Sequence, residues 1–429
     1  MKAVTMREGV LELPSYQPGR PDPEPPLLPG FGQNHLPIYP YPTIEWFEKR
    51  PSPRRLRTVE LENEYLLLVF TPELNGRLYR LYDKLAGAEV LYANSELKPG
   101  LVGLRGVWYA TGIEVNFPSS HNVTTAEEIA CRVLLGDDGS ASFVAWDIEA
   151  TSGMAWECTT TLTPGAAAVT MQTRLANPTD LPHRYYFWVN AAFPIHPGSR
   201  YIFPPSTRRI FTEAGLHPGE LGYLDYPIHR GCDISRFENL RHASSHFGMT
   251  PDEGFFGLHH EHQDTGVAHV ADPHLVPGRK IWSWGFAADG QLWHEALSDS
   301  SGPYCEVQSG PFRSQIEYRA LGPGQELLQR EHWLPLRGLG GLSFANESFA
   351  AAWTAESGTL GLRLLAARSL PRAVLVVDGR EHRLDLSPDD AVLLELPAPE
   401  QSRLRLLDAH RNLVGQFDLT PPPARTAPR

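Results

Sequence analysis

Proline and glycine recur along the whole sequence and divide it into short segments. The chain has 39 prolines and 37 glycines among its 429 residues. Proline breaks a helix interior and glycine weakens one, so this punctuation excludes a coiled coil, a helical bundle and a helical solenoid. Short strands joined by frequent turns are the expected architecture.

Between the turns, the segments have the pattern of β-strands. Residues 58–62 alternate between apolar and polar, 65–70 form an apolar run, and 77–82 alternate again. Comparable segments recur as far as residues 327–335. Regular strands at this spacing predict an all-β fold, built as one large antiparallel β-sandwich over residues 56–338.

The segment before this region is the most proline-rich part of the chain. Residues 14–53 hold 12 prolines, which exclude regular helix and central strand. They also include Trp46 and Phe47, and a solvated linker rarely carries such aromatic residues. We therefore expect residues 1–55 to form an extended N-terminal arm that packs on the main domain. A flexible linker is the alternative.

Two further features organise the rest of the chain. Residues 208–250 are irregular and rich in Gly, His and Arg, so they are expected to form a long excursion with short helices. A glycine-rich segment near residue 340 precedes a run of strand patterns. Residues 345–420 are accordingly predicted to form a small C-terminal β-sandwich module, and 421–429 a disordered tail.

Charge and hydropathy exclude several classes of partner. Lys and Arg number 38 against 50 Asp and Glu, a net charge of −12, which argues against nucleic acid and anionic membranes as partners. No apolar run approaches the roughly 20 residues of a spanning helix. The N-terminus lacks the apolar region of a secretory signal, and the four cysteines are scattered without metal-binding spacing. A cytoplasmic protein with reduced thiols is expected.

The segment 105–125 is the first candidate for chemistry. It contains Arg105, Trp108, Glu114, Asn116 and His121 among small residues. Glu114 lies in an apolar stretch, where it is either an outward-facing strand residue or a buried acid. A buried carboxylate has a raised pKa, which is what a general acid needs.

A second carboxylate lies late in the main domain. Glu306 and Gln308 are two residues apart, so on a strand they share one face. Gln308 would then hold a substrate hydroxyl beside a working Glu306. The alternative is the polar face of a half-buried strand.

A histidine cluster at 259–262 is the third candidate. On a strand, His260 and His262 would point the same way and could bind a metal. No third ligand follows at a known spacing, so we expect no metal. The cluster is interpreted as a polar strand end, or as groups that bind ligand hydroxyls. Nucleotide-binding and nucleophile-elbow motifs are missing too, and no cofactor is expected.

Tryptophans on or beside the predicted strands complete the candidate site. Indole rings stack on the apolar face of pyranose sugars, while amide, imidazole and guanidinium groups bind the hydroxyls. Core packing is the alternative for any single aromatic residue. A carbohydrate site is therefore predicted, with substrate-binding residues Arg105, Trp108, Asn116, His121, Trp188, Asn190, His260, His262, Trp284 and Gln308.

Several segments resemble one known superfamily. Residues 61–65 (LENEY) and 72–78 (PELNGRL) resemble the opening of the galactose mutarotase-like proteins. Residues 112–121 (GIEVNFPSSH), 184–191 (RYYFWVNA) and 304–308 (YCEVQ) are similar to a bacterial branch of largely unassigned function. Many members of that branch carry tetratricopeptide repeats after the sandwich, whereas this chain has the small β module. The resemblance spans about residues 35–337.

The resemblance implies a β-supersandwich with its sugar site in a concave groove. Glu306, followed by Gln308, looks like the catalytic base of the aldose 1-epimerases. The general acid of those enzymes is a histidine, and the similar residue here, His183, is displaced by one position. His121 resembles their earlier substrate-binding histidine. Glu114 has no counterpart, which suggests a second carboxylate near the groove.

Three functions are compatible with these residues. The preferred one is cleavage or transfer of a glycosidic bond in an oligosaccharide or glycoside, with Glu306 and Glu114 as the catalytic pair. The second is an aldose 1-epimerase, and the third is a non-catalytic sugar-binding protein. The C-terminal module is interpreted either as a sugar-binding accessory or as the contact of a homodimer.

Overall fold

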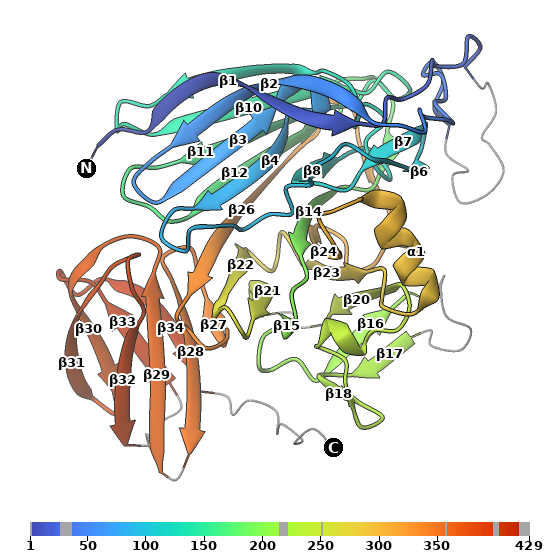
Figure 1. Cartoon of the computed structure of the whole chain (residues 1–429). Helices are drawn as coiled ribbons and strands as arrows, with labels where there is room; N and C mark the ends of the chain where they lie inside the picture. The colour runs from blue at the N-terminus through green and yellow to red at the C-terminus, as the bar shows by residue number, and fades with distance from the viewer. Residues whose placement is uncertain are drawn as a thin grey trace.

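The computed structural model describes residues 2–25, 37–213, 222–249, 252–356, 358–397 and 403–419. Within these residues the regular structure is almost entirely β, and the strands of every sheet pair antiparallel (Figure 1). The predicted all-β sandwich is confirmed. None of the described helices is long and apolar enough to cross a membrane.

The first large sheet has twelve strands in the described residues. Their order across the sheet is β1-β2-β3-β4-β8-β14-β24-β23-β20-β16-β17, with β5 paired to β4. The strands are β1 (Thr5–Ser15), β2 (Ser52–Glu62), β3 (Leu66–Thr71), β4 (Arg77–Asp83), β5 (Ala88–Glu89), β8 (Ile113–Asn116), β14 (Trp188–Pro194), β16 (Arg209–Thr212), β17 (Gly222–Asp225), β20 (Ser244–Gly248), β23 (Gly278–Ser283) and β24 (Tyr304–Gly310).

The second large sheet has eight strands in the part of the chain that the structure describes, in the order β15-β21-β22-β26-β12-β11-β10-β9. The strands are β9 (Ala130–Leu135), β10 (Ala141–Ile148), β11 (Ala155–Leu162), β12 (Val169–Ala176), β15 (Ser199–Ile202), β21 (Phe255–His260), β22 (Thr265–Ala271) and β26 (Glu326–Arg337). One continuous apolar core fills the space between the two sheets, from Phe70 stacked on Phe143 to Phe193 against Trp333.

The C-terminal residues form two four-stranded sheets around their own core. One sheet has the order β27-β28-β29-β32 and the other β31-β30-β33-β34. The strands are β27 (Phe344–Ala345), β28 (Phe349–Glu356), β29 (Thr359–Ala366), β30 (Leu370–Val377), β31 (Arg380–Leu386), β32 (Val392–Pro397), β33 (Arg403–Leu407) and β34 (Leu413–Asp418). The predicted tail 421–429 lies outside the described residues.

Short elements connect the sheets. Three two-stranded pairs are described, β6 (Pro99–Gly103) with β7 (Gly106–Tyr109), β13 (His183–Tyr185) with β25 (Arg319–Leu321), and β18 (Ile228–His229) with β19 (Cys232–Asp233). Helix α1 (Ala288–Leu297) lies against β6, and the 3-10 turns are η1 (Pro72–Leu74) and η2 (Phe237–Asn239). The expectation of short helices in 208–250 holds only for the short 3-10 helix η2, because the other regular elements in its described part are five strands.

The N-terminal segment begins with a regular strand. β1 pairs with β2 over its whole length, from Thr5 opposite Glu62 to Ser15 opposite Ser52, and so forms an edge of the large sheet. The proline-rich part that follows lies against the main domain at Ile44, which is buried and bridges Gly106. A Cβ at Gly106 would lie 2.1 Å from the Ile44 carbonyl oxygen, so only glycine permits this close approach.

Candidate functional site

Four neighbouring strands of the twelve-stranded sheet bring polar residues into one row. Glu114 of β8 lies opposite Asn190 of β14. Gln308 of β24 lies between Asn190 and Lys280 of β23. Adjacent strands are about 4.8 Å apart, so these side chains are lateral neighbours on one face. Glu306 belongs to the same face because it is two residues from Gln308.

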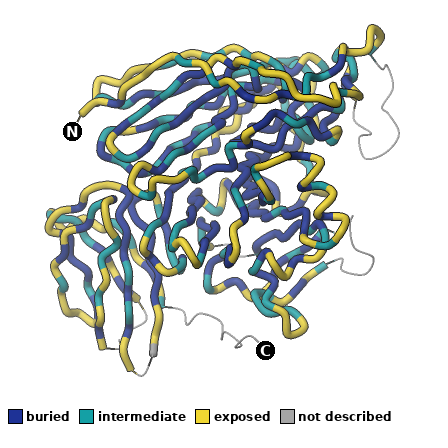
Figure 2. The backbone as a smooth tube through the Cα atoms, in the orientation of Figure 1, coloured by how far each residue is buried: buried dark blue, intermediate teal, exposed yellow. Residues whose placement is uncertain are grey.

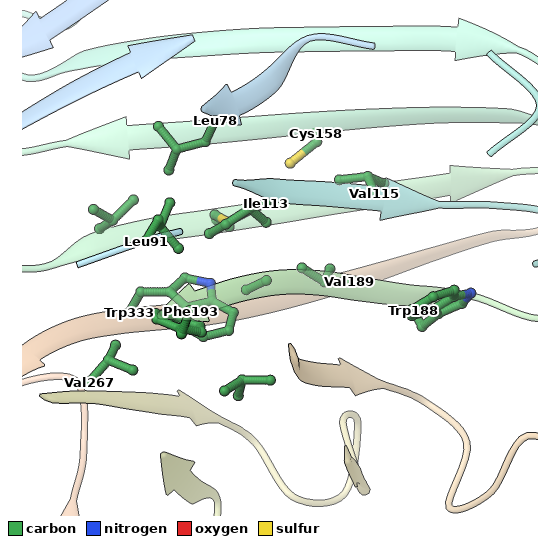
Figure 3. Close-up of a cluster of buried hydrophobic side chains, with 14 of the residues drawn as sticks. Leu78, Leu91, Ile113, Val115, Cys158, Trp188, Val189, Phe193, Val267 and Trp333 are labelled. Carbon is green, nitrogen blue, oxygen red and sulfur yellow. The ribbon is translucent and has the colours of Figure 1, made fainter. Parts of the chain in front are cut away.

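The opposite face of the same strands is the core. Ile113, Val115, Val189 and Phe193 point toward the eight-stranded sheet (Figure 3). The alternation of side chains in a strand therefore separates the apolar packing from the polar row. Although the row is polar, its residues are buried. Figure 2 shows that most of the exposed residues, drawn in yellow, lie along the outer edges and turns of the molecule.

Glu306 is a buried carboxylate with few partners. It accepts hydrogen bonds from the Tyr304 hydroxyl at 3.1 Å and from the Gln308 amide at 2.5 Å. Trp284 donates to the Tyr304 oxygen at 3.0 Å, which fixes the orientation of this hydroxyl. Burial raises the pKa of Glu306, and the nearby charges of His121 and Lys280 offset only part of that increase. A carboxylate with a raised pKa is a stronger base than an exposed one.

Glu114 is also buried but is saturated with donors. One carboxylate oxygen is bonded by Thr125 and lies 3.3 Å from the Arg77 guanidinium. The other accepts hydrogen bonds from Trp108 at 3.0 Å and Asn116 at 3.4 Å. Burial works against the charge of Glu114, but its ionic and hydrogen-bonded partners hold its pKa at about 2. Glu114 therefore stays ionised.

His121 connects Glu114 to the rest of the face. Its Nδ1 lies 3.1 Å from a Glu114 oxygen, and because that carboxylate is ionised, Nδ1 carries the proton in this contact. The ring lies between Trp108 and Trp188, at centroid distances of 4.8 Å and 5.0 Å. Its side chain is 17% exposed, and no described residue hydrogen-bonds Nε2. That nitrogen remains available to a ligand.

Lys280 is the residue that sequence reasoning missed. Its ammonium group is buried and lies 5.3–5.9 Å from the ring centroids of Trp188, Phe247 and Trp282. Burial lowers its pKa to about 8, while Glu306 and Glu213 act in the opposite direction. The signal in the sequence was a lysine two residues before Trp282 in a predicted strand.

Asn190 occupies the centre of the row. It is buried, and its amide oxygen has no hydrogen-bond partner among the described residues. Such an oxygen costs free energy unless a ligand or water binds it. The row thus contains one orphaned acceptor beside Gln308 and next to the carboxylate of Glu306.

The structure brings together most but not all of the residues predicted for the site. Glu306, Gln308, Asn190, Trp188, Glu114, Asn116, His121 and Trp108 share the polar face, and Trp284 reaches Glu306 through Tyr304. Arg105 does not join them, because it holds the N-terminal segment by bonding the Pro42 carbonyl and Glu127.

The two histidines of the 259–262 cluster also lie elsewhere. His260 is in the eight-stranded sheet, where Ser199 contacts its Nδ1 at 2.6 Å and burial lowers its pKa to about 3. The strand ends at His260, so His262 is exposed in the following turn and does not share its face. The described residues contain no group of three or more His, Cys, Asp and Glu side chains placed to hold a metal ion.

His183 does not belong to the polar face either. It lies in β13, and its Nε2 contacts the Thr179 hydroxyl at 3.0 Å. The one-position displacement seen in the sequence thus corresponds to a different location, and His121 is the histidine beside the carboxylates.

A family model matches most of the chain. Residues 33–336 match the family described as "Domain of unknown function (DUF5107)". The chain belongs to the DUF5107 family. This match covers both large sheets except β1, and it includes the whole polar face.

Solved structures extend this finding. A TPR-domain containing protein from Parabacteroides distasonis is 28% identical to this DUF5107 chain, with a TM-score of 0.68. The match covers 78% of this chain and 55% of that protein, so this chain spans about half the length of that relative. The predicted bacterial branch, in which the sandwich is often fused to tetratricopeptide repeats, is therefore confirmed.

More distant matches are galactose mutarotase-like proteins. One from Lactobacillus casei is 13% identical with a TM-score of 0.46, covering 65% of this chain and 99% of that one. Another from Clostridium acetobutylicum is 10% identical with a TM-score of 0.47, covering 66% and 96%.

Proposed function

We propose that this DUF5107 protein is a carbohydrate-acting enzyme of the aldose 1-epimerase type. Glu306 acts as the base and His121 as the acid. The observation that carries the proposal is the difference between the two buried carboxylates. An ionised carboxylate has about four acceptor sites, and Glu306 uses two of them. Glu114 has five donors around it, so no acceptor site remains for a substrate.

The proposed reaction needs one base and one acid on the sugar. Glu306 takes the proton of the anomeric hydroxyl, while His121, acting as the imidazolium with a proton on each ring nitrogen, gives its Nε2 proton to the ring oxygen and keeps the one on Nδ1. The bond between C1 and the ring oxygen breaks, and C1 becomes an aldehyde. Rotation about the C1–C2 bond and the reverse proton transfers close the ring as the other anomer. Glu114 contributes by keeping His121 oriented and protonated on Nδ1.

Glycosidic cleavage requires two carboxylates that both reach the scissile bond. The pair expected from the sequence, Glu306 and Glu114, does not offer this, because Glu114 is engaged by Arg77 and its neighbours. The aromatic rings around the face, among them Trp188 and Trp282, suit the apolar face of a pyranose in either reaction. We therefore favour proton transfer at the anomeric centre over cleavage.

The test is a proton-NMR time course with freshly dissolved α-glucose and α-galactose, run beside β-linked disaccharides. Purified protein is expected to accelerate α/β equilibration and leave every linkage intact. Glu306→Gln and His121→Asn should each slow the reaction by about 10²–10⁴-fold, the usual contribution of a general base or acid.

Glu157→Gln in β11 serves as the matched control, since Glu157 faces away from this site in the other sheet and pairs with Arg132. Its rate should equal that of the unmodified protein. Cleavage of a disaccharide without faster equilibration would establish the glycosidase hypothesis instead. If the protein binds a sugar but changes none of the sugars tested, the hypothesis of a non-catalytic sugar-binding protein would be established.

A further inference from the structure

A second hollow lies away from the polar face, where the main domain meets the C-terminal module. Its volume is about 640 Å³, within the roughly 300–1,000 Å³ of small-molecule sites. Strands β15 and β21 form one wall, and strands β28, β29 and β32 form the other. Figure 1 shows the module beside β21 and β22 of the main domain. None of the residues of the Glu306 site lines this cavity.

The cavity is bounded by a fixed junction rather than by two loosely tethered domains. One apolar cluster is continuous across the boundary, with Phe255 and Leu336 from the main domain and Leu342 and Leu365 from the module. Since this cluster is buried, separating the two parts would expose it to water at a cost. The two walls therefore keep their distance from each other.

Polar contacts hold the connecting segment in the same position. Asp264, in the turn after β21, accepts a hydrogen bond from the Gly340 amide at 2.7 Å, and its carbonyl accepts one from Gly338 at 3.0 Å. Arg363 of the module donates to the Gly338 carbonyl at 3.1 Å. The linker is thus bonded from both sides, and it forms the back of the cavity.

The module wall is a sheet face that includes small residues. Ala352 lies beside Arg363, and Thr354 lies beside Gly361, which in turn lies opposite Glu395. Thr354 is exposed, so its side chain meets no core residue. The small side chains leave room above this face, and Arg363 and Glu395 frame it with one donor group and one acceptor group.

The main-domain wall carries a network of charged side chains. Arg200 contacts Asp233 at 2.6 Å and Glu261 at 3.5 Å. Arg236 contacts Glu261 at 2.8 Å from outside the cavity. The Nε of Arg200 is buried and has no hydrogen-bond partner among the described residues. Side chains that are locked by one another present donors and acceptors in fixed positions.

The lining decides the class of ligand. Arg200 and Arg363 line the cavity together with the acids Asp233, Glu261 and Glu395, so the cavity has no excess positive charge for a phosphate or other anion. These charged groups also disfavour a lipid chain, whose burial would leave them unsatisfied. Donors and acceptors held in fixed positions on both walls suit a neutral molecule with many hydroxyl groups.

We propose that this cavity is a second carbohydrate site, which binds a neutral oligosaccharide between the main domain and the module. The choice of a carbohydrate rests in part on the proposed function of the Glu306 site, whereas the neutrality of the ligand rests on the lining alone. The module would then hold one end of the oligosaccharide, and the rest of the oligosaccharide would extend into solvent.

The test is isothermal titration calorimetry with maltotriose, cellotriose, mannotriose and a trisaccharide of β-linked galactose. The titrations use full-length Glu306→Gln protein, so that turnover at the first site does not contribute. Thr354→Trp places an indole in the cavity from an exposed position and should weaken binding by about tenfold or more, a loss of at least 1.4 kcal/mol.

Arg383→Trp is the matched control, because Arg383 is exposed on β31 in the other sheet of the module. It should bind like the parent. Binding that Thr354→Trp leaves unchanged, or no binding of any trisaccharide at millimolar concentration, would overturn the proposal. The epimerase assay separates the two proposals. If the trisaccharide binds at the cavity but the unmodified protein does not epimerise a sugar, only the proposed function is refuted. Epimerisation without trisaccharide binding refutes only the cavity site.

Discussion

The two buried glutamates of the polar face should respond in opposite ways to the same substitution. Glu114→Gln replaces a carboxylate oxygen with an amide that faces donors such as Arg77 and Thr125. The buried guanidinium then loses its counter-charge, and breaking such a pair typically costs about 3–5 kcal/mol. Glu306→Gln removes a charge whose burial is unfavourable, because burial is the main cause of its raised pKa. Its stability should stay equal or increase.

The magnitude for Glu114 follows from its pKa. Since the ordinary value of 4.5 falls to about 2 in the folded chain, the ionised form is favoured. At about 1.4 kcal/mol per pKa unit, this corresponds to about 3 kcal/mol. The pKa is depressed, so the contribution is complete above the unfolded pKa of 4.5 and is lost as the pH falls towards 2.

The assay is urea unfolding at pH 7 followed by tryptophan fluorescence, with the variants compared through their midpoints at a common slope. Glu114→Gln is expected to lose about 3 kcal/mol, and the gap to the unmodified protein should narrow as the pH falls below 4.5. A loss under about 1 kcal/mol, the value of an exposed ion pair, would refute the reasoning. Equal losses for both variants would refute it too.

Three further changes test other parts of the structure. Lys280→Met removes a positive charge that lowers the pKa of Glu306. The rise of kcat/KM on the acid side of the pH profile should therefore move to higher pH. A pH profile that does not move would contradict this. Asn190→Leu should raise KM, which steady-state kinetics would measure. It should change the free energy of unfolding, measured from the urea midpoint, by less than about 1 kcal/mol, because the Asn190 amide oxygen has no hydrogen bond to lose. Arg337→Met should lower the melting temperature and speed proteolysis of the linker near residue 340, because Arg337 bonds both Asp83 and the Pro388 carbonyl. Unchanged cleavage would show that the apolar cluster alone holds the main domain and the module together.

The sequence predicts the sheets well because their signal is local. Alternation and turn residues are properties of a few neighbouring positions, and they predict strands wherever one face is buried. The shared face of Glu306 and Gln308 follows from the same two-residue period. β1 is the strand that the sequence does not predict, because the many prolines after it favour an extended arm for residues 1–55 as a whole.

The state of the site residues depends on partners far along the chain, which no local pattern reveals. Glu114 looks like a free acid in its own segment, and only Arg77 on β4 makes it a structural anion. His260 and His262 look like a pair until the chain turns between them. The polar residues 261–265 before Gly266 are a turn signal, and they indicate that His260 and His262 do not share one strand.

The polar row is assembled from positions 114, 190, 280 and 308, each on a different strand. Pairing such distant segments requires the closure of long loops, and proteins dominated by these contacts fold slowly. During refolding from urea, secondary structure should therefore return before any activity does. For the same reason, no short fragment of the chain contains the groups needed to build the site, and a protease cut between β8 and β24 should abolish recovery of activity after denaturation.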